Sequence, residues 1–342
     1  MASEAFLSIQ SVISRLKTSH FVRDVAMVGG GIAAGQAIAM VFMPFLTRLY
    51  SPEDFGIAAA FAAVISIITP IATMGYANAI VMPDSDEDAA AIIRLSVLLS
   101  FFITAIAFIA VYFGNVYLAR WTGMESAPYM LYLIPLTLLA GAFLSVADQS
   151  AIRVGLFKAK ARAYVESKFV TDISKLVGGM WAPSSMLLIL LTIAGQLTNF
   201  MMQMLRVPRI GVLNVRDWFG TVCIRNAAIS QRDFAIYRMP QSMLNAASVG
   251  LPTILLASLF SASAAGQYSL AVLVLGAPAM LLGQAVGEVF YPKITRAITS
   301  KSPEAYQFLL KVTVILLVVG IVPFGTVFVF GDYLFSLVFV VS

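Results

Sequence analysis

The sequence predicts an all-α membrane protein with about nine transmembrane helices. Of its 342 residues, 60% are hydrophobic and only 11% are charged, and the mean hydropathy is +0.91. A water-soluble domain of this composition would lack the polar surface that must cover its core. Several apolar runs exceed the length of about 20 residues that crosses a bilayer as a helix, and they lack the alternation of a barrel strand.

A pattern that repeats after about 210 residues also supports this fold class. The polar corner Thr-Arg-Leu-Tyr-Ser-Pro-Glu-Asp-Phe-Gly ends on Gly56, and a similar corner ends 210 residues later on Gly266. The apolar run after each corner contains a proline, Pro70 in the first and Pro278 in the second, which we expect to kink its helix. We interpret the pattern as an internal duplication, with chance similarity between apolar runs as the alternative.

The apolar runs define nine expected spans along the chain. They cover residues 25–47, 55–82, 91–114, 127–151, 163–182, 184–205, 240–260, 266–291 and 306–330. The first six form a complete lobe at 25–205, and the last three begin a second lobe at 240–342. If the repeat unit has six helices, we expect this polypeptide to be a truncated form of a parent of about 420 to 450 residues.

Two polar segments flank the first lobe. The arm at 1–24 places apolar side chains at helical spacing opposite Ser, Gln, Arg and Lys, so we expect it to lie on the membrane surface. The loop at 206–239 carries six arginines and separates the two lobes.

The positions of Lys and Arg predict the orientation in the membrane. With the amino terminus in the cytoplasm, 19 of the 22 basic residues fall on the cytoplasmic side, as the positive-inside rule requires. These residues are spread over separate loops, so the formal charge of +5 indicates contact with lipid headgroups and not with nucleic acid. The acidic tract at 84–88 falls on the same side, either as a solvated loop or as a gating contact to the basic loops.

Five motifs occur in order along the chain. They are Thr-Arg-Leu-Tyr-Ser-Pro-Glu-Asp-Phe-Gly at 47–56, Ala-Ile-Val-Met-Pro at 79–83, Pro-Gln-Ser-Met-Leu-Asn at 240–245, Ala-Gly-Gln-Tyr-Ser-Leu-Ala at 265–271 and Val-Phe-Tyr-Pro at 289–292. Together they resemble the bacterial polysaccharide transporters, or O-antigen flippases, of the multidrug/oligosaccharidyl-lipid/polysaccharide exporter superfamily. The resemblance covers residues 23–339.

The resemblance implies two six-helix bundles around a cavity that opens alternately to either side of the bacterial inner membrane. It implies a cargo of oligosaccharide repeat units linked to undecaprenyl diphosphate, for surface polysaccharide such as lipopolysaccharide O-antigen, capsule or exopolysaccharide. It also implies membrane lipids as surroundings, and a polysaccharide polymerase and glycosyltransferases as candidate partners. The resemblance implies no cofactor.

The scarcity of histidine and cysteine argues against an enzyme. His20 is the only histidine and Cys223 the only cysteine, so no His-carboxylate cluster or metal site can be assembled within the spans. The glycines at 29–31 lack the Lys-Ser/Thr of a phosphate-binding loop, and close helix packing explains them better. We therefore expect a transporter without a metal or cofactor.

Charged residues within spans are the first candidates for cargo contacts, because each costs roughly 2.5–3.5 kcal/mol at a helix centre. Lys175 and Asp172 lie one helical turn apart, close enough to pair. They either neutralise each other, or Lys175 contacts a diphosphate or an acidic sugar and Asp172 holds it between cargoes. Glu288 either reaches the membrane interface or couples transport to protons.

Charged residues at span ends are the second group of candidates. Asp148 and Arg153, at the cytoplasmic end of the fourth span, are either interfacial residues or an inner-gate pair. Arg23 and Arg48 bracket the first span on opposite sides of the membrane. By the resemblance, Arg23 meets the diphosphate as it enters from the cytoplasm, whereas topological anchoring is the simpler interpretation.

Uncharged polar residues within the spans either bond between helices or line the cavity. They are Gln36, Asn78, Gln196, Asn199, Gln203, Asn245 and Gln284. Of these, Asn78 and Gln284 are taken as cavity candidates.

Two other functions remain open from the sequence. A drug/cation antiporter of the same superfamily would need buried carboxylates, and the first span has none between Asp24 and Glu53. A truncated, non-transporting membrane component of the polysaccharide assembly machinery is the other alternative.

Overall fold

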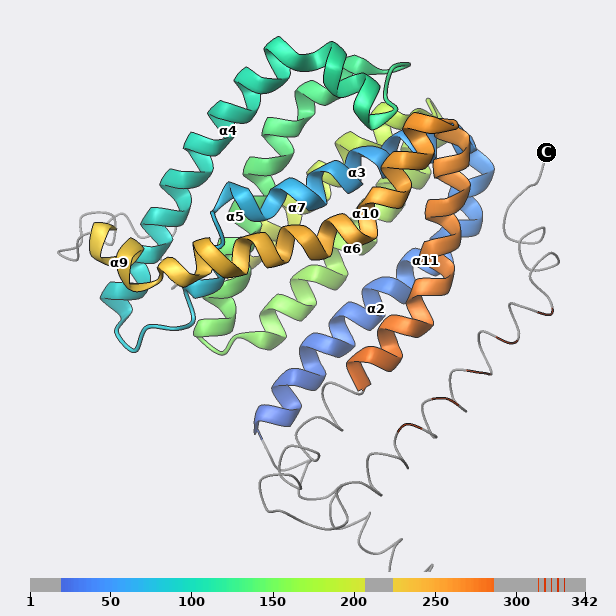
Figure 1. The fold of residues 1–342 in the computed structure, drawn as a ribbon. Coiled ribbons are helices and arrows are strands. Elements are labelled where there is room, and N and C mark those ends of the chain that lie inside the picture. The colour runs from blue at the N-terminus through green and yellow to red at the C-terminus, as the bar shows by residue number, and fades with distance from the viewer. Residues whose placement is uncertain are drawn as a thin grey trace, which may run out of the picture.

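The computed structural model describes residues 20–206, residues 224–285 and five isolated helical residues, which are 313, 317, 321, 325 and 329. In these parts of the chain the regular structure is all helical, with nine α-helices and no strand (Figure 1). Six helical segments there are long and apolar enough to cross a membrane. The all-helical prediction is therefore confirmed for the described residues, and the six segments are consistent with a membrane protein.

Residues 20–206 contain six long helices. They are α2 (His20–Leu49), α3 (Pro52–Ala72), α4 (Asp86–Thr122), α5 (Ile134–Arg153), α6 (Phe157–Gly179) and α7 (Ser185–Arg206). Three further helices follow in the described residues: α9 (Ile224–Ser230), α10 (Met239–Leu259) and α11 (Ala262–Ala285). The shorter elements are the 3-10 turns η1 (Tyr76–Ala79) and η2 (Pro128–Leu133) and the π-helical turn η3 (Phe234–Arg238).

Three expected segments lie largely outside the described residues. These are the surface arm, the middle of the basic loop and the ninth span. The described part of the basic loop contains α9 and η3.

The polar corner that ends on Gly56 contains the start of α3. Ser51 caps this helix, because its Oγ accepts a hydrogen bond of 3.1 Å from the backbone N–H of Asp54. The backbone N–H of Ser51 donates in return to Asp54 Oδ2 at 3.2 Å, which completes a capping box. Pro52 occupies the first helical position, where its missing N–H costs nothing.

The second expected span, at 55–82, is not one continuous helix. Helix α3 ends at Ala72, and Gly75 adopts a left-handed conformation with φ of 75° before η1 begins. A left-handed residue stops an α-helix. Glycine is also required there by space, because a Cβ would lie 2.7 Å from the backbone oxygen of Phe234 in η3.

Helix α4 is longer at both ends than the expected span at 91–114. It contains 37 residues. Ser85 caps its start by accepting a hydrogen bond from the backbone N–H of Asp88 at 3.1 Å. Gly123, left-handed with φ of 69°, ends it. The polar residues of both caps lie beyond the apolar run, which is why hydropathy alone misplaced the ends.

Helix α3 lies at the centre of the described fold. It packs against α7 on one side and against both α10 and α11 on the other (Figure 1). Helices α2 and α6 pack along each other, and α6 also contacts α7. Gly31 shows how close the first contact is, because a Cβ there would lie 2.8 Å from the Cβ of Ala161. This agrees with the packing interpretation for Gly31, whereas nothing lies within 4 Å of a Cβ at Gly30.

The two corner glycines of the sequence repeat meet where α3 crosses α11. A Cβ on Gly56 would lie 1.7 Å from the backbone oxygen of Ala262, and a Cβ on Gly266 would lie 1.9 Å from the backbone oxygen of Pro52. Gly56 and Gly266 are 210 positions apart, and so are Pro52 and Ala262, which makes the contact reciprocal. Such pairing of matching positions is what two duplicated halves related by an approximate two-fold axis would produce.

Candidate functional site

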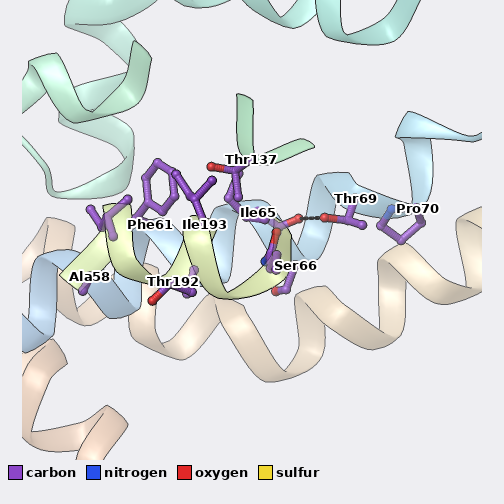
Figure 2. Close-up of a pocket in the computed structure, with 12 residues that line it drawn as sticks. Ala58, Phe61, Ile65, Ser66, Thr69, Pro70, Thr137, Thr192 and Ile193 are labelled. Atoms are coloured by element: carbon purple, nitrogen blue, oxygen red, sulfur yellow. Dashed lines mark hydrogen bonds between the residues drawn. The ribbon is translucent and has the colours of Figure 1, made fainter. Parts of the chain in front are cut away.

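A cavity of about 360 Å³ lies between α3, α5 and α7 (Figure 2). Helix α3 lines it from Ala58 to Pro70, and α7 lines it from Ile189 to Gln196. Helix α5 contributes Thr137. On α3 and α7 the lining residues recur every three or four positions, so each helix presents one face to the cavity.

One end of the cavity is more polar than the other, and Thr192 lies nearer the less polar end (Figure 2). Ala58 and Phe61 lie at one end, whereas Thr69 and Pro70 lie at the other (Figure 2). Pro70 provides no backbone N–H, so the carbonyl group of Ser66, four residues earlier, has no helical donor. The proline that the sequence marked as a kink is therefore part of the polar end.

Four hydroxyl groups line the cavity, and each donates its hydrogen to a carbonyl of its own helix. The bonds are Ser66 to Ala63 at 2.8 Å, Thr69 to Ile65 at 2.6 Å, Thr137 to Leu133 at 2.8 Å and Thr192 to Leu188 at 2.7 Å. The Oε1 atom of Gln196 is buried and has no hydrogen-bond partner. The sequence had named Gln196 as an uncharged polar candidate but missed all four hydroxyls.

Asp148 and Arg153 do not pair. The Nε2 of Gln203 donates to Asp148 Oδ1 at 2.7 Å, and the Nζ of Lys160 lies 3.5 Å from Asp148 Oδ2. Asp148 therefore joins α5 to α6 and α7. The two residues expected as an inner-gate pair belong to separate interactions.

Arg153 instead binds the segment between η1 and α4. Its guanidinium donates to the carbonyl oxygens of Ile80 at 3.2 Å and Ser85 at 3.0 Å, and also to that of Pro83. It also pairs with Asp86 Oδ1 at 2.9 Å. The acidic tract thus contacts one basic residue, although the Asp86 side chain is 99% exposed.

Asp172 pairs with Lys168 and not with Lys175. The Nζ of Lys168 lies 3.2 Å from Asp172 Oδ1, one turn earlier on α6. The Asp172 side chain is only 3% exposed, and its Oδ2 is buried without a hydrogen-bond partner. Lys175 is half-buried and makes no salt bridge to a carboxylate of the described chain.

The remaining candidates do not gather at one place. Asn78 accepts a hydrogen bond of 3.1 Å from Gln149, so it bonds between η1 and α5. Arg48 is exposed at the end of α2. Arg23 lies in α2 and Gln284 in α11, but their side chains are not among those the structure describes. Glu288 lies outside the described residues.

The corner at 47–56 also fixes parts of α6 and α7, a role that the sequence did not indicate. Asp54 Oδ1 accepts a hydrogen bond of 2.7 Å from the backbone N–H of Ser185, at the start of α7. The hydroxyl of Tyr50 donates to the backbone oxygen of Lys175 at 2.8 Å. Burial, and to a lesser extent the nearby charge of Asp54, raises the pKa of Tyr50 above its usual value of 10.0.

In the described part of the chain, no group of three or more His, Cys, Asp and Glu residues is placed to hold a metal ion. The 360 Å³ cavity contains no charged side chain. The Ser and Thr hydroxyls and Gln196 that line it can form hydrogen bonds with a ligand.

Comparison with protein families gives a match over most of the chain. A family model described as polysaccharide biosynthesis protein matches residues 45–340. No curated protein and no solved structure matches the chain. Because the matched region covers most of the sequence, it shows the family, and the six apolar helical segments agree with a multi-pass membrane protein. The chain belongs to the family of polysaccharide biosynthesis proteins.

Proposed function

We propose that this protein is an inner-membrane flippase. It translocates oligosaccharide repeat units linked to undecaprenyl diphosphate for surface polysaccharide assembly, with its amino terminus in the cytoplasm. The family match over residues 45–340 carries this proposal, because it ties a protein with six apolar helical segments to polysaccharide biosynthesis. Because the proposed cargo is linked to a membrane lipid, it must be translocated across the bilayer. We assign this translocation step to the protein.

The crossing of α3 and α11 supports alternating access. In the proposed orientation, Gly56 and Gly266 lie near the outer face, where their backbones are in contact. Backbone contacts between two matching elements close that face without interlocking side chains. Separation of the two halves at this crossing would then open the outer side.

Lys175 is the cationic side chain that we propose to contact the diphosphate or an acidic sugar. It is half-buried on α6, and its backbone is held by Tyr50. Arg23, at the cytoplasmic start of α2, is the proposed first contact for the diphosphate. Neither role requires bond-making chemistry, so this function needs no catalytic residue.

A deletion strain tests the proposed function. We expect lipid-linked repeat units to accumulate on the cytoplasmic leaflet, and the 342-residue chain to restore surface polysaccharide. Lys175→Ala should abolish restoration at normal expression, whereas Lys158→Ala, which alters an exposed lysine of the same helix, should not. Unchanged surface polysaccharide in the Lys175 variant would remove that residue from the proposal. Absence of cytoplasmic accumulation in the deletion strain would contradict the flippase function itself.

One observation favours the antiporter alternative. Asp172 is a buried carboxylate with an unpartnered oxygen, which is the kind of group that exchanges a cation or a proton. A drug/cation antiporter would give a drug-sensitivity phenotype in the same deletion strain, with normal surface polysaccharide.

A further inference from the structure

We propose that the cavity between α3, α5 and α7 binds one neutral sugar residue by accepting hydrogen bonds from its hydroxyl groups. This inference rests on the proposed function, since it assigns the sugar to the cargo. It adds that the sugar and the diphosphate are recognised at different places.

The lining of the cavity is mostly apolar, and its polar groups are acceptors more than donors. A Ser or Thr hydroxyl has one hydrogen to donate and two lone pairs that accept. Ser66, Thr69, Thr137 and Thr192 each donate that hydrogen to a backbone carbonyl three or four residues earlier. Their oxygens therefore act toward a ligand only as acceptors.

Two further acceptors belong to residues that line the cavity. The Oε1 of Gln196 is buried without a partner, and a buried polar atom left in that state is costly. The carbonyl of Ser66 lacks its helical donor because residue 70 is proline. The only side-chain donor that remains in the lining is the amide group of Gln196.

The charge of the lining excludes ionic ligands. The cavity contains no Asp, Glu, Lys or Arg side chain. A diphosphate or a metal ion placed there would be a charge in an apolar protein interior without a counter-charge. The fitting ligand is therefore neutral and carries several hydrogen-bond donors, which describes the hydroxyl groups of a sugar.

The shape of the cavity also suits an amphipathic ring. Its polar end holds Thr69 and Pro70, and its opposite end holds Phe61 and Ala58 (Figure 2). Ser66 on α3 and Thr192 on α7 are exposed, so both helices offer a hydroxyl where the cavity meets its surroundings. The cavity volume of about 360 Å³ leaves room for a single ring and some water.

Binding of neutral methyl glycosides to the full chain in lipid nanodiscs tests the proposal. The probes are the methyl glycosides of glucose, galactose, rhamnose and N-acetylglucosamine, and inorganic diphosphate is the charged comparison. We expect at least one glycoside to show saturation transfer in NMR. Thr192→Val and Gln196→Leu should each weaken its binding about tenfold, because the first removes one acceptor and the second removes an acceptor together with the amide donor.

Thr198→Val is the matched control. Thr198 is on the same helix and makes the same kind of bond, donating to the carbonyl of Ala194 at 2.8 Å, but it does not line the cavity. Its replacement should leave glycoside binding unchanged. Thr192 is exposed, so its valine variant tests the site without disturbing buried packing.

Two results would overturn the proposal. One is the absence of binding by all four glycosides to the wild-type chain, and the other is wild-type binding by both cavity variants. Restoration of surface polysaccharide without glycoside binding would contradict this site and leave the proposed function standing. The chain could also bind glycosides in the cavity and yet fail to restore surface polysaccharide. That result would contradict the flippase function, while the proposed sugar site would stand.

Discussion

Tyr50 holds the end of α6 through a hydrogen bond of 2.8 Å from its hydroxyl to the backbone oxygen of Lys175. The ring is buried, with 2% of the residue exposed. Gly179 leaves space for it, because a Cβ there would lie 2.7 Å from the ring. The corner after α2 thereby sets the position of the helix segment that carries the proposed cargo lysine.

Tyr50→Phe should lower the free energy of unfolding by about 1 kcal/mol, because it removes the hydroxyl and keeps the ring. Burial, then Asp54, raises the Tyr50 pKa above 10.0 in the folded chain. The stabilisation should therefore be constant below about pH 10 and decline above it, as the unfolded chain loses its proton first. Denaturant unfolding in detergent at several pH values measures this. Tyr117→Phe, at a tyrosine that is 73% exposed, should show no difference at neutral pH.

Gly56→Ala should destabilise the crossing of α3 and α11. Its Cβ would lie 1.7 Å from the backbone oxygen of Ala262, so the two helices must separate. Overpacking of this kind costs about 1–3 kcal/mol. Gly30→Ala is the control, because nothing lies within 4 Å of a Cβ at that position. A thermal midpoint for Gly56→Ala equal to or above that of the wild-type chain would show that the contact is not close.

Arg153→Ala should destabilise the protein much more than Asp86→Asn. Loss of the guanidinium leaves the carbonyls of Ile80, Pro83 and Ser85 without their donor, for which we expect about 3 kcal/mol. The Asp86 carboxylate is almost fully exposed, and exposed ion pairs contribute little. Equal effects of the two substitutions in denaturant unfolding would show that the ion pair, and not the carbonyl contacts, holds this segment.

Asp172→Asn should destabilise the protein by about 1–3 kcal/mol, because Lys168 loses its partner while 70% of its side chain stays buried. The double variant Asp172→Asn, Lys168→Gln should recover part of that loss, since no unpaired charge remains. A double-mutant cycle in unfolding free energy measures the coupling. Strictly additive effects would mean that the two side chains do not interact.

The helices were predictable where an apolar run and a helix have the same length. The expected spans at 184–205 and 240–260 differ by one residue at each end from α7 and α10. The break after α3 was not predictable, because the apolar run continues through Gly75 while the backbone at Gly75 adopts a left-handed conformation. Hydropathy records the solvent that a residue prefers and carries no information on its φ angle.

The pairs within the site were harder to predict. Asp172 has a lysine one turn away on each side, and local spacing permits either partner. Asp148 and Arg153 are five residues apart, which places them about 140° apart around a helix and so on different faces. Helical geometry alone therefore argued against that pair.

The hydroxyls of the cavity were missed for another reason. A search for charged residues in an apolar chain overlooks Ser and Thr, because their hydroxyls donate hydrogen bonds to carbonyl groups of the same helix. Their spacing around Pro70 was nevertheless visible, because Ser66, Thr69 and the proline itself fall on one face of a helix.

The length of α4 makes the fold responsive to its lipid. Its 37 residues extend about 55 Å at 1.5 Å per residue, against roughly 30 Å of hydrocarbon in a bilayer. Large exposed apolar side chains run from Leu98 to Trp121. This stretch is about 36 Å long, which exceeds the hydrocarbon thickness and favours a tilted helix. Helix α4 packs on α5. A thicker membrane would therefore reduce the tilt of both helices and move Thr137 of α5 relative to α3 and α7.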